Sequence, residues 1–254
     1  MKIATFNLWN KDSTWSIRKG SIIKEILSIN ADIIALQEVP RIQEIESISK
    51  HVDVKYYNFM QYEGEEEGLA ILSKYPIECI SNKINTILNQ CAQRVIAKVN
   101  GMNIGITNVH LNWESVYQRE MEIIEVVNWI SESNSPDYEI LCGDFNSTPY
   151  KSSIYNFLVG EASINSIDTS WIDLGQSLKS PTLDFINNNW LHNRDNLNNI
   201  RVPVRYDWTL LKSCYPKEES KLSNIEIFAN KTTAMYKNFP SDHYGVYVDL
   251  DFGK

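Results

Sequence analysis

Residues 138–146, YEILCGDFN, join an apolar stretch to a polar turn, and the fold can be worked out from this junction. The part that ends at Cys142 is rich in side chains typical of a buried strand. Gly143 then begins a turn that carries Asp144 and Asn146. The segment predicts a strand that presents a carboxylate and an amide at its end. A purely structural Asx turn, in which Asp144 bonds its own backbone, is the alternative interpretation.

Similar strand-forming segments occur along the whole chain and are rich in Ile, Val, Leu, Tyr and Thr. They lie at residues 2–8, 32–38, 68–73, 93–99, 103–110, 138–143, 205–211 and 244–252. Helical periodicity predicts amphipathic helices at 16–29 and 114–131 and a shorter helix at 152–159. Many strands with fewer helices favour an α/β fold, in which two sheets pack face to face and helices cover the outside. The Asn-rich residues 186–200 predict a surface loop.

The composition is that of an ordinary soluble protein, with 43% hydrophobic and 22% charged residues. No repeat or Pro-rich linker divides the sequence, so we expect a single domain over residues 1–254. No apolar run is long enough to cross a bilayer, and the first residues, MKIATF, lack the features of a signal peptide. We therefore expect a cytoplasmic monomer without a membrane-spanning segment.

Cysteine spacing and net charge narrow the class of function. The four cysteines (Cys79, Cys91, Cys142 and Cys214) lack the paired spacing of a sulfur-bound zinc site and are expected to be reduced thiols. The net charge of −8 disfavours a protein that grips nucleic acid through bulk electrostatics. It leaves open an enzyme that handles phosphate through a metal ion, because the ion supplies local positive charge.

Polar side chains recur at the ends of the apolar strands. They are Asn7, Glu38, His110, Asp144 with Asn146, Asp207, and Asp242 with His243. If the last strands run antiparallel to the earlier ones, these groups meet at one edge of the sheets. Repulsion between two like charges about 4 Å apart costs roughly 1 kcal/mol in water and roughly 4 kcal/mol at an effective dielectric constant of about 20. Clustered carboxylates therefore favour a bound cation, and oxygen ligands suit Mg²⁺ or Mn²⁺.

Six short motifs, in order, resemble those of the endonuclease/exonuclease/phosphatase superfamily. They are residues 5–9 (TFNLW), 36–39 (LQEV), 108–111 (NVHL), 143–149 (GDFNSTP), 205–208 (RYDW) and 241–243 (SDH), and residues 67–77 (EGLAILSKYPI) are similar to a further family segment. The resemblance spans residues 3–246. It implies a deoxyribonuclease I-like four-layer sandwich, with two packed mixed β-sheets flanked by helices. It also implies metal-dependent hydrolysis of a phosphoester by in-line attack of an activated water.

The resemblance implies a metal-and-water site. Glu38 is the principal ligand of Mg²⁺ or Mn²⁺, with Asn7 beside it holding metal or phosphate, and Asp242 is a second candidate ligand. Asp144 orients or deprotonates the attacking water, and Asn146 holds that water or a phosphate oxygen. Whether one metal or two take part stays open.

The two histidines of the motifs have implied roles at the phosphate. His243 contacts it and takes part in proton transfer, with Asp207 fixing the tautomer of His243. His110 donates a hydrogen bond to a non-bridging oxygen. Either Asp144 or His243 could be the general base.

Three further residues are weaker candidates for substrate binding. Glu67 could orient His110 or lie in solvent. Arg119 could reach the substrate from its helix, although a charge on the helix surface is the favoured interpretation. Trp190 could stack on a substrate ring, and core packing explains it equally well.

The substrate class stays open at the level of the sequence. His110 stands where the exonuclease III branch of the family usually has Tyr, and the His-bearing branches include both nucleases and small-molecule phosphatases. We expect a phosphoester substrate, with a phosphodiester favoured and nucleic acid among the candidates. The alternatives are a phosphatase acting on a small molecule or lipid headgroup, and a catalytically inactive binding module on the same fold.

Overall fold

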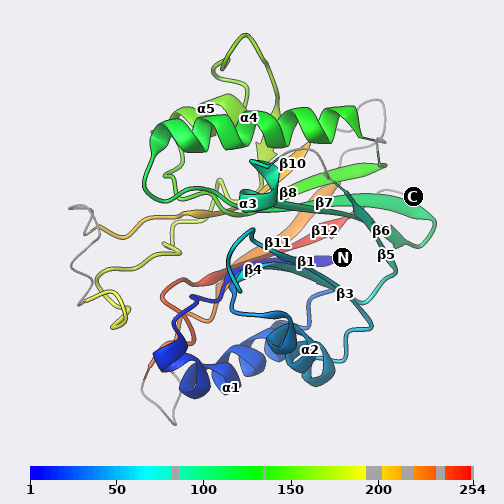
Figure 1. Cartoon of the computed structure of the whole chain (residues 1–254). Coiled ribbons are helices and arrows are strands. Elements are labelled where there is room, and N and C mark those ends of the chain that lie inside the picture. Colours follow the sequence, from blue (N-terminus) through cyan, green and yellow to red (C-terminus); the bar gives the residue numbers. More distant parts are fainter. Residues whose placement is uncertain (82–85, 134–135, 193–201, 213–219, 233–237, 253–254) are drawn as a thin grey trace.

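The computed structural model describes residues 1–81, 86–133, 136–192, 202–212, 220–232 and 238–252. Over these residues, two six-stranded sheets pack face to face and helices cover both outer faces (Figure 1). This is the predicted α/β sandwich. Cys214 and residues 193–200 of the Asn-rich segment lie outside the described residues.

The first sheet combines the N-terminal strands with the last two strands of the chain, in the order β11-β12-β1-β2-β4-β3. Its strands are β1 (Lys2–Asn7), β2 (Ile33–Val39), β3 (Tyr56–Gln61), β4 (Gly68–Ser73), β11 (Lys221–Phe228) and β12 (Gly245–Asp251). β1 and β2 are parallel, whereas β12 is antiparallel to β1. The start of β12 therefore lies beside the end of β1.

The second sheet has the order β5-β6-β7-β8-β10-β9. Its strands are β5 (Ile77–Ile80), β6 (Ala92–Val99), β7 (Met102–His110), β8 (Tyr138–Asp144), β9 (Trp171–Asp173) and β10 (Asp207–Lys212). β7 and β8 are parallel, and β10 is antiparallel to β8. The start of β10 therefore meets the ends of β7 and β8, as the sequence-based hypothesis required.

Helices form the two outer layers (Figure 1). α1 (Asp12–Ile29) and α2 (Ile42–His51) cover the first sheet, and α3 (Leu88–Cys91), α4 (Val116–Glu132) and α5 (Ser153–Leu158) cover the second. None of the helices within the described ranges is both long and apolar enough to cross a membrane.

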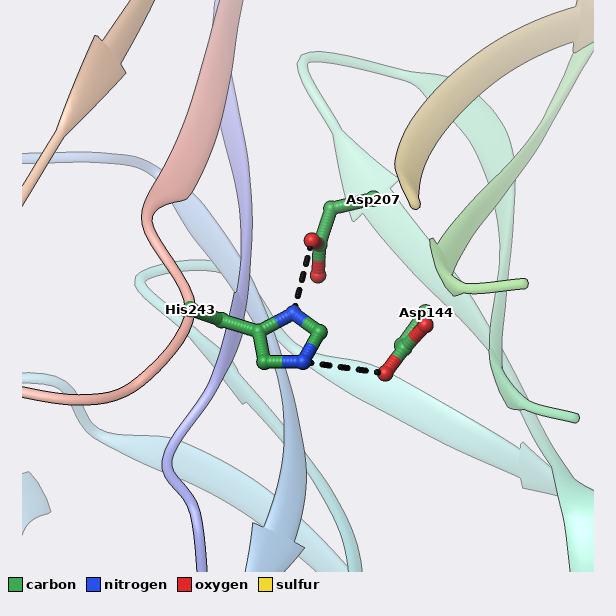
Figure 2. Close-up of side chains that lie close together, drawn as sticks. All are labelled: Asp144, Asp207 and His243. Atoms are coloured by element: carbon green, nitrogen blue, oxygen red, sulfur yellow. Dashed lines mark hydrogen bonds and ion pairs between the residues drawn. The ribbon is translucent and has the colours of Figure 1, made fainter. Parts of the chain in front are cut away.

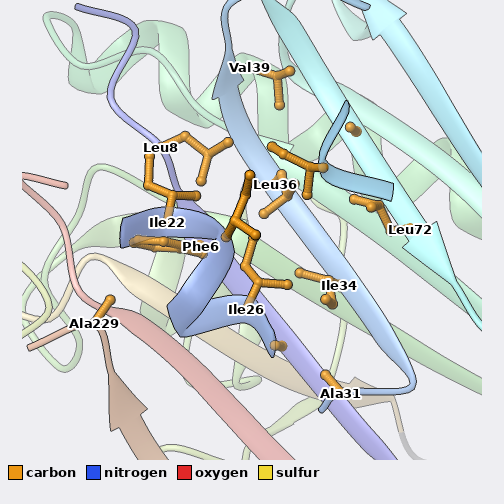
Figure 3. Packing of buried hydrophobic residues seen from close by; sticks show 14 of the residues in the cluster. Phe6, Leu8, Ile22, Ile26, Ala31, Ile34, Leu36, Val39, Leu72 and Ala229 are labelled. Atoms are coloured by element: carbon orange, nitrogen blue, oxygen red, sulfur yellow. The ribbon is translucent and has the colours of Figure 1, made fainter. Parts of the chain in front are cut away.

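The packing of α1 shows how the apolar pattern produces this arrangement. Ile22 and Ile26 lie one helical turn apart and are buried in one cluster with Phe6 and Leu36 of the sheet (Figure 3). Full burial of each such side chain stabilises the fold by about 1.5–3 kcal/mol. The helix ends at Ile29, and the next residue, Asn30, caps it with a left-handed φ of 48°. This layer holds the ends of β1 and β2 in place.

The structure contains elements that the sequence did not predict. β3, β5, β9, β11, α2 and α3 are all additional to the prediction, α1 begins at Asp12 instead of residue 16, and β10 begins at Asp207 instead of residue 205. All four additional strands lie at sheet edges, where fewer apolar side chains are buried. The extra helices are short, with ten residues in α2 and four in α3.

Candidate active site

Three predicted site residues stand in one row at an edge of the second sheet. In the strand register, His110 at the end of β7 is opposite Asp144 at the end of β8. Asp144 is in turn opposite Asp207 at the start of β10. Directly opposed residues have neighbouring side chains, so the register itself brings these groups together.

Glu38 reaches the site from a distorted stretch of the first sheet. The pairing of β2 with β4 is interrupted between Leu36 and Val39, and Glu38 has a φ of 51°. Such a left-handed conformation is strained for a side-chain-bearing residue, by roughly 1–3 kcal/mol. A bulge of this kind redirects a side chain.

The environment of Glu38 keeps its carboxylate ionised. Burial opposes the charge, but His110 and hydrogen bonds from Asn7 and Asn10 outweigh it and hold the pKa of Glu38 below its ordinary value. The backbone N–H of Asn10 donates to Oε2 at 2.9 Å. Glu38 therefore presents a negative charge to the site.

Asn7 joins the two sheets at their common edge. Its Nδ2 donates to Glu38 Oε1 and to Asp144 Oδ2, at 3.0 Å each. The N–H of Trp9 donates to Asn7 Oδ1 at 2.9 Å, which fixes the amide in this orientation. Asn7 thus acts in this structure as a donor shared by two carboxylates, and its role beside a metal stays a prediction.

The end of β8 and the turn that follows it set the position of Asp144. Gly143 has a φ of 141°, and a Cβ there would lie 1.9 Å from the carbonyl oxygen of Val109. The N–H of Asn146 donates to Asp144 Oδ1 at 2.9 Å, and Asn146 Nδ2 donates to the carbonyl of Leu111 at 2.8 Å. The Asx bond considered from the sequence is present, and it leaves Oδ2 of Asp144 directed at the site.

His243 lies between two carboxylates (Figure 2). Its Nδ1 is 2.9 Å from Asp207 Oδ2, and its Nε2 is 3.7 Å from Asp144 Oδ2. Burial lowers the pKa of His243, but Asp207 and Asp144 outweigh this effect and raise it to about 10. A carboxylate can only accept, so Nδ1 carries a proton and Nε2 faces the reaction site.

Thr182, which no sequence pattern singled out, positions Asp207. Its Oγ1 accepts from the N–H of Tyr206 at 2.9 Å and of Asp207 at 3.1 Å. The Thr182 carbonyl accepts from the N–H of Tyr244 at 2.7 Å. This fully buried residue therefore links the chain before β10 to the chain around His243.

His110 faces the same carboxylates from the second sheet. Its Nε2 is 3.8 Å from both Glu38 Oε1 and Asp144 Oδ2. Its Nδ1 lies 3.2 Å from the hydroxyl of Tyr62. The sequence suggested Glu67 for this position, but Glu67 accepts a hydrogen bond from the side chain of Asn10. Burial raises the pKa of Glu67.

Asp242 is buried in the turn that precedes β12, and its Oδ1 accepts from the Ser241 hydroxyl at 3.2 Å. That hydroxyl also donates to the carbonyl of Asn7 at 2.8 Å.

The amide of Asn188 donates to the carbonyls of Ser241 and Asp242, at 2.9 and 3.1 Å. The prediction that 186–200 is a surface loop is thus wrong at Asn188, which is fully buried because it satisfies these two carbonyls.

Trp190 lies beside this turn and packs against Trp9, with ring centroids 5.2 Å apart. Its indole N–H donates to the carbonyl of Phe239 at 2.8 Å. Trp9 itself is buried with a left-handed φ of 57°. The packing interpretation of Trp190 describes these contacts, and its role in substrate binding stays a prediction.

Arg119 is buried, so the favoured prediction of a charge on the helix surface is wrong. Its Nη1 donates to the carbonyl of Asn112 at 2.8 Å, which fastens the loop that follows His110. Burial lowers the pKa of the guanidinium, partly offset by Tyr206, Glu122 and Asp144. Arg119 therefore lies within the electrostatic field of Asp144, and its contact with substrate stays a prediction.

Comparison with known proteins identifies the family of the chain. The model of the Endonuclease/Exonuclease/phosphatase family matches residues 4–243. The chain belongs to this family. The family and fold predicted from the sequence are thereby confirmed.

Relatives within the family are distant. Mouse Protein angel homolog 2 is 28% identical over 169 residues, covering 57% of this chain and 31% of that protein. The CCR4-Not complex 3'-5'-exoribonuclease subunit Ccr4 of Mycosarcoma maydis is 24% identical, covering 58% of this chain and 32% of its own length. The chain thus spans about a third of the length of these curated relatives.

Among solved structures, Danio rerio TDP2 in complex with a single-strand DNA product has a TM-score of 0.75 and 15% identity. The match covers 99% of this chain and 98% of the other. At this identity the likeness establishes the fold of this family member.

Proposed function

We propose that the chain is a divalent-metal-dependent hydrolase that cleaves a phosphodiester through an activated water. The Asn7 amide carries this proposal, because it ties the Glu38 and Asp144 carboxylates together at 3.0 Å each. Two histidine Nε2 atoms then face Asp144 Oδ2 at 3.8 and 3.7 Å. Paired carboxylates next to two imidazoles are suited to binding a cation and moving a proton.

The oxygen atoms of Glu38 and its neighbouring carboxylates fit a hard divalent cation. Its carboxylate remains ionised, and an unfavourable backbone conformation holds it at the site. The carboxylates of Glu38, of Asp144 at the end of β8 and of Asp242 before β12 would supply the oxygen ligands that Mg²⁺ or Mn²⁺ prefers. When bound, the ion would polarise the phosphoryl group and offset negative charge.

A second set of ligand types overlaps with the first. Atoms of Asp144, Asp207 and His243 all lie within 4.8 Å of one another. However, the 2.9 Å bond between Asp207 and His243 already occupies Nδ1. We therefore favour proton transfer as the role of this pair and assign the cation to the Glu38 side.

The chain's own groups account for the remaining chemistry. Asp144 accepts a hydrogen bond from Asn7 and can orient the attacking water, while Asn146 fixes the carboxylate through its N–H. His243, with Nδ1 held by Asp207, presents Nε2 to the phosphate region. His110 Nε2 approaches from the end of β7 and can donate to a phosphoryl oxygen.

The negative charge of the site and the named relatives together favour a phosphodiester substrate. A diester carries one negative charge per phosphate, whereas a monoester carries about two at neutral pH. The acidic groups of the site thus oppose a diester less than a monoester. The exoribonuclease named among the relatives, and the DNA product bound to Danio rerio TDP2, support a nucleic acid strand as the substrate class.

The test is a hydrolysis panel of single-stranded RNA, single-stranded DNA, plasmid DNA, sphingomyelin and inositol phosphates, with Mg²⁺, Mn²⁺ or chelator. We expect metal-dependent cleavage of a strand, and a loss of at least about a hundredfold in kcat for Asp144→Asn. Asp12→Asn, whose side chain is 77% exposed, is the matched control. Cleavage of only sphingomyelin or inositol phosphates would favour an enzyme acting on a lipid headgroup or a small molecule, and absence of hydrolysis would favour a binding module.

A further inference from the structure

The loop between β7 and α4 carries a group of exposed apolar side chains close to His110. Trp113 and Tyr117 are 55% and 70% exposed, and Val116 beside them is 56% exposed. Isolated apolar side chains are common on protein surfaces, but here three lie within five residues of one another. Trp and Tyr are also the side chains that binding interfaces favour. We call Trp113 and Tyr117 the aromatic platform.

The backbone that carries the platform is fixed by hydrogen bonds. The side-chain oxygen of Asn112 accepts from the N–H groups of Glu114 and Ser115, at 3.0 and 2.8 Å. Buried Arg119 donates to the carbonyls of Asn112 and Trp113, at 2.8 and 3.4 Å. An aromatic side chain on a fixed backbone has few rotatable bonds left, so it loses little conformational freedom when it binds. The loop therefore presents the platform in a form that needs little ordering.

The platform lies close to the atoms that would act on a phosphate. Trp113 is three residues from His110, so their Cα atoms are at most about 11 Å apart. The N–H of Leu111 donates to the carbonyl of Asp144 at 3.0 Å, which holds the start of the loop against the end of β8. Stacked nucleotides advance by about 3.4 Å along one strand. A strand with a phosphate at His110 therefore reaches the platform within about three nucleotides.

The charge around the platform favours bases over phosphates as the groups that it binds. Glu114 is exposed beside Trp113, and the chain has a net charge of −8. Phosphates would be repelled by this carboxylate. Every base has a face that stacks on an aromatic ring, and such stacking strengthens binding by roughly five- to a hundredfold per base. A membrane fits less well, because interfacial protein surfaces combine aromatic residues with Lys or Arg.

We propose that Trp113 and Tyr117 form a base-stacking subsite for single-stranded nucleic acid, next to a phosphate at His110. Stacking depends on contact with the ring, so it allows an acidic protein to hold a polyanionic strand. The subsite selects unpaired strands, because the bases of a duplex are held in their stack by pairing. The position of the phosphate rests on the proposed function, whereas the affinity of the platform for bases does not.

The affinity of the platform for bases can be measured without catalysis. Fluorescence anisotropy of a labelled oligodeoxyadenylate gives the Kd of each variant, with chelator present to prevent metal-dependent cleavage. A matched oligomer of abasic residues carries the same phosphates and lacks the bases. We expect the wild type to bind the oligodeoxyadenylate at least about tenfold more tightly than the abasic oligomer.

Variants test whether this preference comes from the platform. Trp113→Ala should weaken binding of the oligodeoxyadenylate roughly tenfold and leave binding of the abasic oligomer unchanged. Tyr117→Ala should weaken the former roughly fivefold, and Trp113→Phe, which keeps a ring, should retain most of the affinity. Tyr56→Ala, at the start of β3 and 37% exposed, is the control and should bind both oligomers as the wild type does.

Equal affinity of the wild type for the two oligomers, or binding of neither, would overturn the proposal. An equal loss for both oligomers in Trp113→Ala would also overturn it, since the ring would then act only on the structure of the loop. Binding to phosphatidylcholine vesicles that is lost in Trp113→Ala would replace the strand by a lipid surface. Base preference without any cleavage would contradict only the proposed hydrolase, and cleavage without base preference would contradict only the subsite.

Discussion

At the scale of single residues, the site depends on side chains that serve two partners at once. Asn7 donates to two carboxylates, and His243 lies between Asp207 and Asp144. These residues could be predicted because each belongs to a short motif, and the motifs follow one another in the order seen in the family. The motifs could not predict Tyr62, since a lone tyrosine in an acidic loop carries no recognisable pattern. The missing signal is a contact between β7 and a loop 48 residues earlier in the chain.

The pairing of Asp207 with His243 gives a prediction at this scale. Asp207→Asn preserves the shape of the side chain but replaces the accepting carboxylate, so Nδ1 of His243 loses the partner that keeps it protonated. We expect kcat for phosphodiester hydrolysis to fall at least about a hundredfold, with a smaller change in KM. Steady-state kinetics beside Asp12→Asn provide the measurement. Equal kcat values for the two variants would refute the role of Asp207.

At the scale of elements, strand ends were predictable and edge strands were not. β8 is buried over its whole length and apolar from Ile140 to Cys142, so its end near Asp144 could be located from the sequence. β11 is exposed over most of its length, so its residues lack the apolar pattern of a buried strand. The bulge that directs Glu38 inward also depends on pairing with β4, which is not visible within residues 36–39.

Gly143, near the end of β8, gives a prediction about stability. In Gly143→Ala, the new Cβ would approach the Val109 carbonyl to 1.9 Å at an unfavourable φ of 141°. We expect the free energy of unfolding to fall by about 1–3 kcal/mol. Gly20→Ala is the control, because Gly20 lies inside α1 with no atom within 4 Å of its Cβ position. That change should be neutral or stabilising by up to about 1 kcal/mol.

Urea unfolding followed by circular dichroism measures both variants. Gly143→Ala with the same midpoint and slope as the wild type would show that this position tolerates a side chain. The backbones of β7 and β8 would then separate readily at Gly143 to admit a methyl group.

At the scale of the whole molecule, the site exists because two sheets meet at one edge. Asn7 and Glu38 come from the first sheet, and His110, Asp144 and Asp207 come from the second. A buried network behind them joins the same sheets, in which Gln37 Nε2 donates to Asn108 Oδ1 at 2.6 Å. Composition and periodicity predicted the two sheets, but not which side chains meet across them, because those contacts depend on how the sheets are stacked.

Glu38, joined to Asp144 by Asn7, is the proposed cation site of a phosphodiester hydrolase. Mn²⁺ binding, followed by electron paramagnetic resonance in metal-free protein, tests it most directly. Glu38→Gln removes the charge with little change in shape, and Glu78→Gln, with a 64% exposed side chain on β5, is the control. We expect wild type and Glu78→Gln to bind Mn²⁺ alike, and Glu38→Gln to bind it at least about tenfold more weakly. Equal affinity in all three proteins would contradict the account.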